Sequence, residues 1–463
     1  MKKIAFLTIV SSLLLCSCKP IVAVAPEIEV AQELEIPNQP LSSINIPIKV
    51  NLKPYFKDTE KSIPKKFTGD EQVCEGVSYA YSFYRDPIDF KGTGKDLTFN
   101  VDGEYSLKLN YCPKCSDLFA SSSYCVTPRI YTSCGIDEPR RKVAVSYSTE
   151  IGVGKDYHLT SKTKLNSIKA KSPCKITVFE YNATETLEEE LTKALKDVEK
   201  DIDKEIEAIN LKPEMEKTWK ALIAPSNLEG YGFLYLNPSK MSISDITYKG
   251  DTAYFNAVLH ARPKIYSSEQ EIKTNTLPNL SNYKTSNGFD VSMDIFAQYD
   301  SISSILTKNI SGTSVDIKGR EVIFGNISVY GASNKQISIK VDFTGKKKGT
   351  IYLIGTPVFD AKEQYISFPD MTFDLKSKDA LLKSAKWLFD KKITDAIRTS
   401  SAVDLKPYLA TLKETMNESL KMEIDKGVYM DGRIKTIDID YIQPKEKELF
   451  IRINSKGTLS IKM

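Results

Sequence analysis

The chain has 463 residues, of which 41% are hydrophobic and 27% are charged, and its net charge is +4. This is a globular composition, and the length is sufficient for two domains. The net charge is too small to indicate a protein that binds nucleic acid.

Residues 1–18 have the layout of an export signal. Lys2 and Lys3 precede the apolar run 4–15, which is too short to span a bilayer comfortably. Leu15-Cys16-Ser17-Cys18 resembles the bacterial lipobox, so we expect Cys18 to become a lipidated N-terminus. An ordinary cleaved signal without lipid is the alternative. Lys19 stands where an inner-membrane retention signal would have Asp, which favours the outer membrane, facing the periplasm or the cell surface.

Residues 19–40 are rich in Pro and Glu and predict a tether. A first α+β unit is expected over residues 41–273. Strict alternation over residues 44–52 predicts a half-buried strand, and Pro54 then begins a short helix. Alternating segments over 77–111 and 143–170 predict a curved antiparallel sheet, in which Tyr79, Tyr81 and Phe83 line either a core or a cavity.

Six cysteines lie beyond the signal segment: Cys74, Cys112, Cys115, Cys125, Cys134 and Cys174. An even set in an exported chain predicts disulfides, and their connectivity stays open. Residues 112–134 read as an insertion between strands. A four-cysteine metal site, with Cys112 and Cys115 as its first pair and Cys125 and Cys134 as its second, competes with this interpretation, but the second pair is too widely spaced for a zinc ribbon. We therefore expect no metal.

Residues 185–209 predict a long amphipathic helix. Its apolar stripe consists of Leu187, Leu191, Leu195, Val198, Ile202, Ile206 and Ile209. The charge run Glu188-Glu189-Glu190 is expected on a solvated face. Asn210-Leu211-Lys212-Pro213 follows, and Pro213 opens a second helix that carries Trp219. A predicted hairpin, 240–246 with 251–259, closes the unit.

Polar residues 274–288 predict a linker to a second unit over residues 289–463. This unit repeats the order of strand, short helix, sheet, helix pair and hairpin, with Asp404-Leu405-Lys406-Pro407 inside its helix pair. Its long helix is predicted at 379–399. The fold class that we predict is α+β, with two repeated units, each a curved antiparallel sheet wrapped around a long amphipathic helix.

Gly355-Thr356-Pro357-Val358-Phe359-Asp360, followed by residues 366–375 and 380–388, resembles the signature block of a lipoprotein family called domain of unknown function 4403. Ser43-Ile44-Asn45-Ile46-Pro47-Ile48 resembles the start of that family. The block carries no catalytic residue. The duplicated order of elements resembles the tubular lipid-binding (BPI-like) proteins, the class of bactericidal/permeability-increasing protein. That resemblance implies an apolar groove for acyl chains near the wrapped helices.

No nucleophile elbow, phosphate loop, dinucleotide fingerprint or acid–base pair of carboxylates occurs in the sequence, so we expect neither an enzyme nor a cofactor. We expect an envelope protein, anchored through Cys18, that binds phospholipid or another hydrophobic ligand and no nucleic acid. The groove is predicted to be lined by Leu187, Leu191, Leu195, Val198, Ile202, Trp219, Leu381, Leu382, Trp387 and Leu388. In the alternative, these residues fill two cores and the protein is a structural or interaction lipoprotein of the outer membrane without a ligand.

Overall fold

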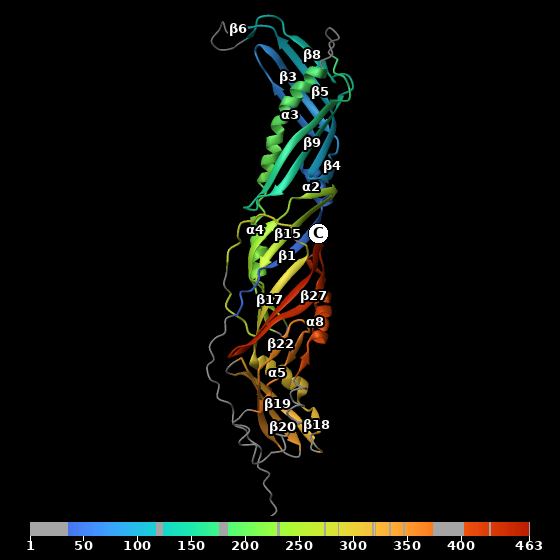
Figure 1. Ribbon diagram of the computed structural model, residues 1–463. Coiled ribbons are helices and arrows are strands. Elements are labelled where there is room, and N and C mark those ends of the chain that lie inside the picture. Colours follow the sequence, from blue (N-terminus) through green and yellow to red (C-terminus); the bar gives the residue numbers. More distant parts are fainter. Residues whose placement is uncertain are drawn as a thin grey trace, which may run out of the picture.

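The computed structural model describes residues 36–116, 124–175, 184–228, 232–272, 275–285, 287–316, 319, 321–332, 335–345, 348–373, 402–425 and 427–462. Figure 1 shows an elongated molecule with the cysteine-bearing strands at one end and the C-terminus midway along it. The predicted signal, Cys18, most of the tether and the second long helix with Leu381, Leu382, Trp387 and Leu388 lie outside the described residues. Within the described ranges, no helix combines the length and apolarity needed to cross a membrane.

The fold class differs from the predicted α+β repeat, and that prediction is wrong. The protein is mostly β, with 54% strand and 19% helix, and 18 strands form one large curled sheet rather than two sheets wrapped around helices. The cause is pairing between segments that are distant in sequence. β1 (Ser42–Asn51) pairs along its length with β15 (Thr252–Ala261), and parts of it also pair with β17 (Phe289–Gln298) and β28 (Glu448–Lys462).

This pairing uses the backbone N–H and C=O groups of both halves of the chain, so the sheet continues through the middle of the molecule. The predicted unit boundaries near residues 273 and 289 stay predictions. The region between them is packed rather than free, because Leu280 is buried beside Tyr157 and Met241. Its N–H also donates to the carbonyl oxygen of Lys155 at 2.9 Å.

One end of the molecule, which we call the tip end, is built from antiparallel strands. They are β2 (Lys66–Glu71), β3 (Gly76–Arg85), β4 (Asp89–Gly94), β5 (Asp96–Cys112), β8 (Ile130–Cys134), β9 (Arg141–Val153) and β10 (Leu159–Ala170), with the small pair β6 (Cys115–Ser116) and β7 (Tyr124–Cys125) beside them. Within the alternating stretch predicted over 77–111, residues Asp96–Cys112 form the single strand β5. Its first part pairs with β4 and β9 and its last part with β3 and β8, so β5 joins both groups of strands.

The middle of the molecule and its other end contain the remaining strands. The large sheet also includes β11 (Ser226–Asn227), β12 (Phe233–Tyr235), β13 (Pro238–Ile243), β14 (Thr247–Gly250), β16 (Lys264–Tyr266), β26 (Lys421–Asp425) and β27 (Val428–Pro444). A second sheet contains β18 (Ser314–Asp316), β19 (Glu321–Gly331), β20 (Ile337–Gly345), β21 (Gly349–Gly355) and β24 (Thr372–Phe373), and a third contains β22 (Val358–Asp360), β23 (Tyr365–Ser367) and β25 (Val403–Asp404). Both predicted hairpins are confirmed, since β13 and β14 pair with β15 and β27 pairs with β28.

Five helices lie along the sheets in the described part of the chain: α2 (Lys53–Ser62), α3 (Thr184–Glu207), α4 (Lys212–Ile223), α5 (Tyr299–Ile310) and α8 (Lys406–Ser419). Three of them begin with Lys-Pro, as Pro213 and Pro407 predicted. In each case the Asn or Asp two residues before the lysine accepts the lysine N–H, at 2.9–3.2 Å. Proline has no N–H that would need an acceptor in the first turn, and the Asn or Asp side chain satisfies the N–H of the lysine before it. This four-residue motif therefore favours the start of a helix.

Candidate ligand-binding face

An apolar face runs along β2, β3 and β5 at the tip end. The strand register places Tyr79 opposite Leu109, Tyr81 opposite Leu107 and Phe83 opposite Tyr105. Because alternate side chains of a strand share one side, these residues project to the same side of the sheet. We call this side the inner face; it consists of Phe67, Val77, Tyr79, Tyr81, Phe83, Tyr105, Leu107, Leu109 and Tyr111.

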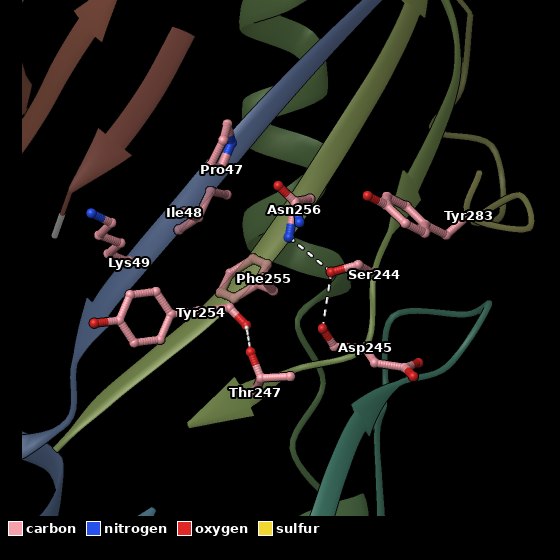
Figure 2. Close-up of a pocket in the computed structure, with 10 residues that line it drawn as sticks. All are labelled: Pro47, Ile48, Lys49, Ser244, Asp245, Thr247, Tyr254, Phe255, Asn256 and Tyr283. Carbon is pink, nitrogen blue, oxygen red and sulfur yellow. Dashed lines mark hydrogen bonds between the residues drawn. The ribbon is translucent and has the colours of Figure 1, made fainter. Parts of the chain in front are cut away.

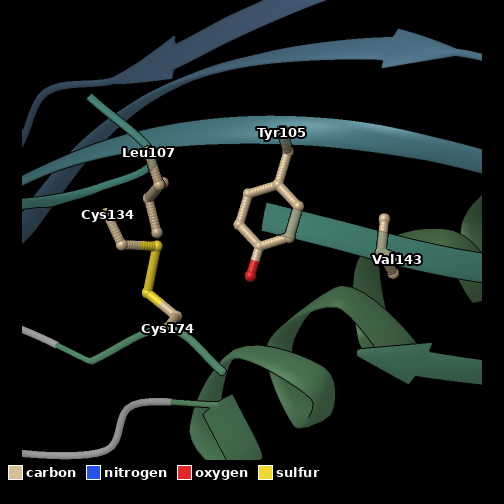
Figure 3. Close-up of a cluster of buried hydrophobic side chains, with 5 residues drawn as sticks. All are labelled: Tyr105, Leu107, Cys134, Val143 and Cys174. Atoms are coloured by element: carbon tan, nitrogen blue, oxygen red, sulfur yellow. A yellow bond between two sulfur atoms is a disulfide. The ribbon is translucent and has the colours of Figure 1, made fainter. Parts of the chain in front are cut away.

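The centre of the inner face is a packed core. Tyr105 and Leu107 of β5 lie against the Cys134–Cys174 disulfide, as Figure 3 shows, and Val143 of β9 packs on the same cluster. The disulfide fastens the segment that precedes α3 to the end of β8. Leu187, in the first turns of α3, packs on this cluster too. This part of the inner face is therefore filled by side chains.

Helix α3 is held along the edge of the sheet by its carboxylates. β10 pairs with β9 on one side only, and on its other side three backbone N–H groups donate to α3. Ala170 donates to Glu188 at 2.6 Å, Leu165 to Glu199 at 2.7 Å and Thr163 to Asp203 at 2.9 Å. The sequence placed Glu188 on a solvated face, and this prediction is wrong. The helix thus protects an edge strand that would otherwise expose unpaired backbone.

The predicted lining residues fall into three groups. Leu187, Leu191, Leu195, Val198 and Ile202 are half-buried on one side of α3, as their spacing predicted. Trp219 lies elsewhere, buried in α4 near the middle of the molecule, where its Nε1 donates to Asn275 Oδ1 at 3.0 Å. It is a core residue and does not belong to the inner face. The four residues of the second long helix lie outside the described residues.

The rest of the inner face is not covered by α3. Phe67, Val77, Tyr81 and Tyr111 keep 38%, 52%, 40% and 44% of their surface exposed. Tyr81 lies over Gly69, the residue opposite it on β2, and a Cβ added at Gly69 would come within 2.6 Å of the Tyr81 ring. The glycine thus allows the ring to lie flat across the neighbouring strand. The result is an open aromatic surface next to a closed core.

Several polar atoms are buried on the same side of the sheet. The Tyr105 hydroxyl and the Oγ1 atoms of Thr132, Thr149 and Thr163 have no hydrogen-bond partner among the described residues. Burial raises the pKa of Tyr105, so its hydroxyl is a neutral donor at physiological pH. Unpaired buried polar atoms are uncommon in folded proteins. These donors would be satisfied by the carbonyl or hydroxyl oxygens of a bound molecule, or by water.

A pocket of about 590 Å³ lies at the middle of the molecule, between β1, β15 and the turn that joins β13 to β14 (Figure 2). Its hydroxyl groups serve the local backbone. Ser244 Oγ accepts the N–H of Asn256 at 2.9 Å, and Thr247 Oγ1 donates to the Tyr254 carbonyl oxygen at 3.2 Å. Asp245 pairs with Lys95 at 2.6 Å. These contacts stabilise a turn, so Ser244, Asp245 and Thr247 are already engaged within the protein.

The cysteine prediction is confirmed. The structure has the disulfides Cys74–Cys115, Cys112–Cys125 and Cys134–Cys174. The competing four-cysteine metal site is wrong, because its cysteines are divided among three bridges. The connectivity could not be predicted, since six cysteines allow fifteen pairings. Within the residues that the structure describes, no group of three or more His, Cys, Asp or Glu side chains is placed to hold a metal ion.

A family model described as Domain of unknown function (DUF4403) matches residues 40–463. The chain belongs to this family. The resemblance predicted from the block beginning at Gly355 is thereby confirmed. In the structure of this DUF4403 protein, the Asp370 carboxylate accepts both the N–H and the hydroxyl of Thr356, at 2.6 and 2.7 Å. The block therefore ties the end of β21 to the segment before β24, which is a structural role.

Several solved structures are similar to the DUF4403 chain at low identity. The crystal structure of lipopolysaccharide binding protein is 10% identical, with 92% of this chain and 99% of that chain covered, at a TM-score of 0.25. The crystal structure of P47 of Clostridium botulinum E1 is also 10% identical, with 91% and 98% covered, at 0.19. No curated protein matches the chain. The expected likeness to BPI-like proteins is found, but it is weak and supports no statement about a ligand.

Proposed function

We propose that this DUF4403 protein is an exported, lipid-anchored envelope protein that binds a lipid or another hydrophobic ligand and catalyses no reaction. The observation that carries the proposal is the inner face, where Phe67, Val77, Tyr81 and Tyr111 stay 38–52% exposed beside a packed core. A contiguous aromatic and aliphatic surface of this kind commonly marks a binding site.

The chemistry of the inner face suits an acyl chain. Most of the exposed side chains are apolar, with the Glu71 carboxylate opposite Tyr79 as an exception, and the half-buried stripe of α3 continues the apolar surface on the other side of the core. Covering them with a hydrocarbon chain gains roughly 0.8 kcal/mol for each methylene that leaves water. The exposed aromatic rings therefore supply the affinity.

The anchor is a separate part of the proposal and rests on the sequence Leu15-Cys16-Ser17-Cys18. A lipidated Cys18 would attach residues 19–40 to the membrane, and Lys19 favours the outer membrane. Growth with a labelled fatty acid tests this directly. We expect label on the parent protein and none on Cys18→Ser. Label that stays on Cys18→Ser would show that the acyl group lies elsewhere.

The binding proposal is tested on the chain from Lys19 to Met463, exported so that its disulfides form and purified without detergent. Organic extraction and mass spectrometry would then identify any bound lipid. We expect an acyl-chain lipid in stoichiometric amount, and little in a control protein of similar size. A clean extract from folded protein, both before and after incubation with liposomes, would contradict the proposal and favour the interaction lipoprotein with filled cores.

A further inference from the structure

The tip end carries further exposed apolar side chains beyond the inner face, with Ile130 on the side of Tyr111 and Tyr131 on the opposite side of β8. Tyr124, Val126, Ile130 and Tyr131 are 44%, 52%, 44% and 69% exposed. We call these four residues the tip patch. They belong to β7, to the start of β8 and to the turn between them, which lie at the far end of the molecule in Figure 1. Large apolar side chains concentrated at one extremity indicate an interaction surface.

The tip patch is fixed in place by covalent and polar contacts. The Cys112–Cys125 disulfide joins its strand to the end of β5, and Cys74–Cys115 joins β6 to the segment before β3. The small β6–β7 pair adds backbone hydrogen bonds. Because the backbone is held on both sides, the side chains cannot withdraw into a core. Their exposure is a property of the folded tip.

Two cations and one acid lie beside the tip patch among the described residues. Lys114 is exposed in the turn after β5. The half-buried Arg129 guanidinium donates to Asn110 Oδ1 at 2.7 Å and to the Val73 carbonyl oxygen at 3.4 Å, and both acceptors are uncharged. Glu75 is exposed and accepts the N–H of Cys115 at 3.0 Å, so it keeps its negative charge. The patch therefore combines apolar rings with a small excess of positive charge.

We propose that the tip patch docks this protein onto the surface of an anionic phospholipid bilayer. Tyrosine rings are amphipathic and favour the headgroup level of a bilayer, while Val126 and Ile130 can reach the acyl region. Lys114 and Arg129 would meet lipid phosphates, and each such charge adds attraction that weakens with salt. We favour a bilayer over a protein partner, because a protruding end with these side chains can enter a deformable lipid surface, whereas a protein partner would need a matching recessed pocket.

The tip patch is continuous with the inner face. In the strand register Ile130 lies opposite Tyr111, and Tyr111 lies opposite Val77. A docked tip would therefore place the exposed end of the inner face at the bilayer surface. This last point rests on the proposed function, since it gives an acyl chain a short route from the bilayer to the inner face. Docking itself does not require that a ligand be bound.

Flotation with vesicles of phosphatidylethanolamine and phosphatidylglycerol tests the docking. The chain from Lys19 is used, so that no lipid anchor contributes. Tyr131→Ser is compared with Tyr408→Ser, because both tyrosines are 69% exposed and Tyr408 lies on α8, away from the tip. We expect about tenfold weaker binding for Ile130→Ser combined with Tyr131→Ser, and parental binding for Tyr408→Ser. Binding should also weaken in high salt.

Tryptophan fluorescence tests directly whether the tip residue enters the bilayer, whatever the affinity for vesicles. Tyr131→Trp should shift its emission to shorter wavelength when vesicles are added, and Tyr408→Trp should not. Failure of the parent protein to bind these vesicles, or equal binding by the tip and control variants, would overturn bilayer docking. Lipid extraction separates docking from the proposed function, because Tyr131→Ser should keep its bound lipid even when its binding to vesicles is weaker.

Discussion

The Glu199 carboxylate of α3 accepts the backbone N–H of Leu165 in β10 at 2.7 Å. With the equivalent contacts of Glu188 and Asp203, it holds a long helix against the free edge of the tip-end sheet. These contacts place α3 over the β10 side of the inner face. The aromatic residues of β2 and β3, on the other side, stay open, and this asymmetry creates the proposed binding surface.

Replacing Glu199 should weaken the attachment of α3. We expect Glu199→Leu to lower the free energy of unfolding by about 1.5–3 kcal/mol, because a charge-assisted hydrogen bond is lost and a half-buried N–H is left unpaired. Glu199→Gln keeps an acceptor oxygen and should lose less. Glu205→Leu, an exposed acid on the same helix, is the control. Urea unfolding and hydrogen exchange at Leu165 measure the effect; unchanged exchange in Glu199→Leu would contradict it.

The disulfides should differ in their contribution to stability. Cys134–Cys174 closes a sequence separation of 40 residues and Cys112–Cys125 one of 13. In the chain-entropy model, removal of the longer bridge costs roughly 1 kcal/mol more, and each costs about 2–4 kcal/mol. Paired Cys→Ser variants, compared by denaturant unfolding, measure this. Equal losses would indicate that packing around Tyr105, rather than loop closure, sets the contribution.

A buried ion pair fixes the start of the folded chain. Arg452 of β28 bonds to Asp294 of β17 at 2.7 and 3.0 Å, with 4% and 5% of their side chains exposed. The same guanidinium donates to the carbonyl oxygen of Pro37 at 2.8 Å. We expect Asp294→Leu alone to cost about 3–5 kcal/mol of stability, because it leaves a buried charge unpaired.

The double variant Arg452→Met with Asp294→Leu provides the control for that ion pair. It removes both charges and should recover much of the loss. Proteolysis after Pro37 should increase in the double variant, because only that variant removes the guanidinium that donates to the Pro37 carbonyl oxygen. If the single and double variants unfold at the same denaturant concentration, the pair contributes through packing and not through charge.

Acid should weaken the contact between α2 and β3. The N–H of Ile88 donates to the Glu60 carboxylate at 3.0 Å and, with Arg85, holds the pKa of Glu60 below its ordinary value despite an opposing effect of burial. A lowered pKa stabilises the fold above the unfolded-state pKa, and this contribution is lost as pH falls through the folded-state pKa. Glu60→Gln should therefore be less stable than the parent at pH 7 and match it below about pH 3. Urea midpoints of the two proteins between pH 3 and pH 7 measure the difference. A difference in midpoint that does not change with pH would contradict the prediction.

Local features of the fold were accessible from the sequence. Alternation in β3 predicted that Tyr79, Tyr81 and Phe83 share one side, and the spacing from Leu187 to Ile202 predicted the buried stripe of α3. Both are periodicities of single elements. The starts of α2 at Pro54 and of α4 at Pro213 were also predicted, because proline is favoured in the first turn of a helix.

The errors arose where distant segments meet. The pairing of Ile48 with Phe255 on one side and with Ile461 on the other cannot be read from local patterns, so the single sheet was missed. The role of Glu188 was missed because a surface charge run looks the same whether or not a free strand edge lies beside it. Trp219 could belong to a core or to the groove on sequence grounds, and its position in α4 makes it a core residue. The exposure that defines the inner face also required the structure, since alternation does not show which residues a helix will cover.

The most direct test of the proposed function compares two valines. Val77, on the inner face, is 52% exposed, and Val358, on β22, is 48% exposed. Val77→Asp places a carboxylate where an acyl chain would lie, so we expect the bound lipid recovered by extraction to fall about tenfold or more, with Val358→Asp retaining the parental amount. Both variants should unfold at the denaturant concentration of the parent. Equal lipid in the two variants would contradict binding at the inner face.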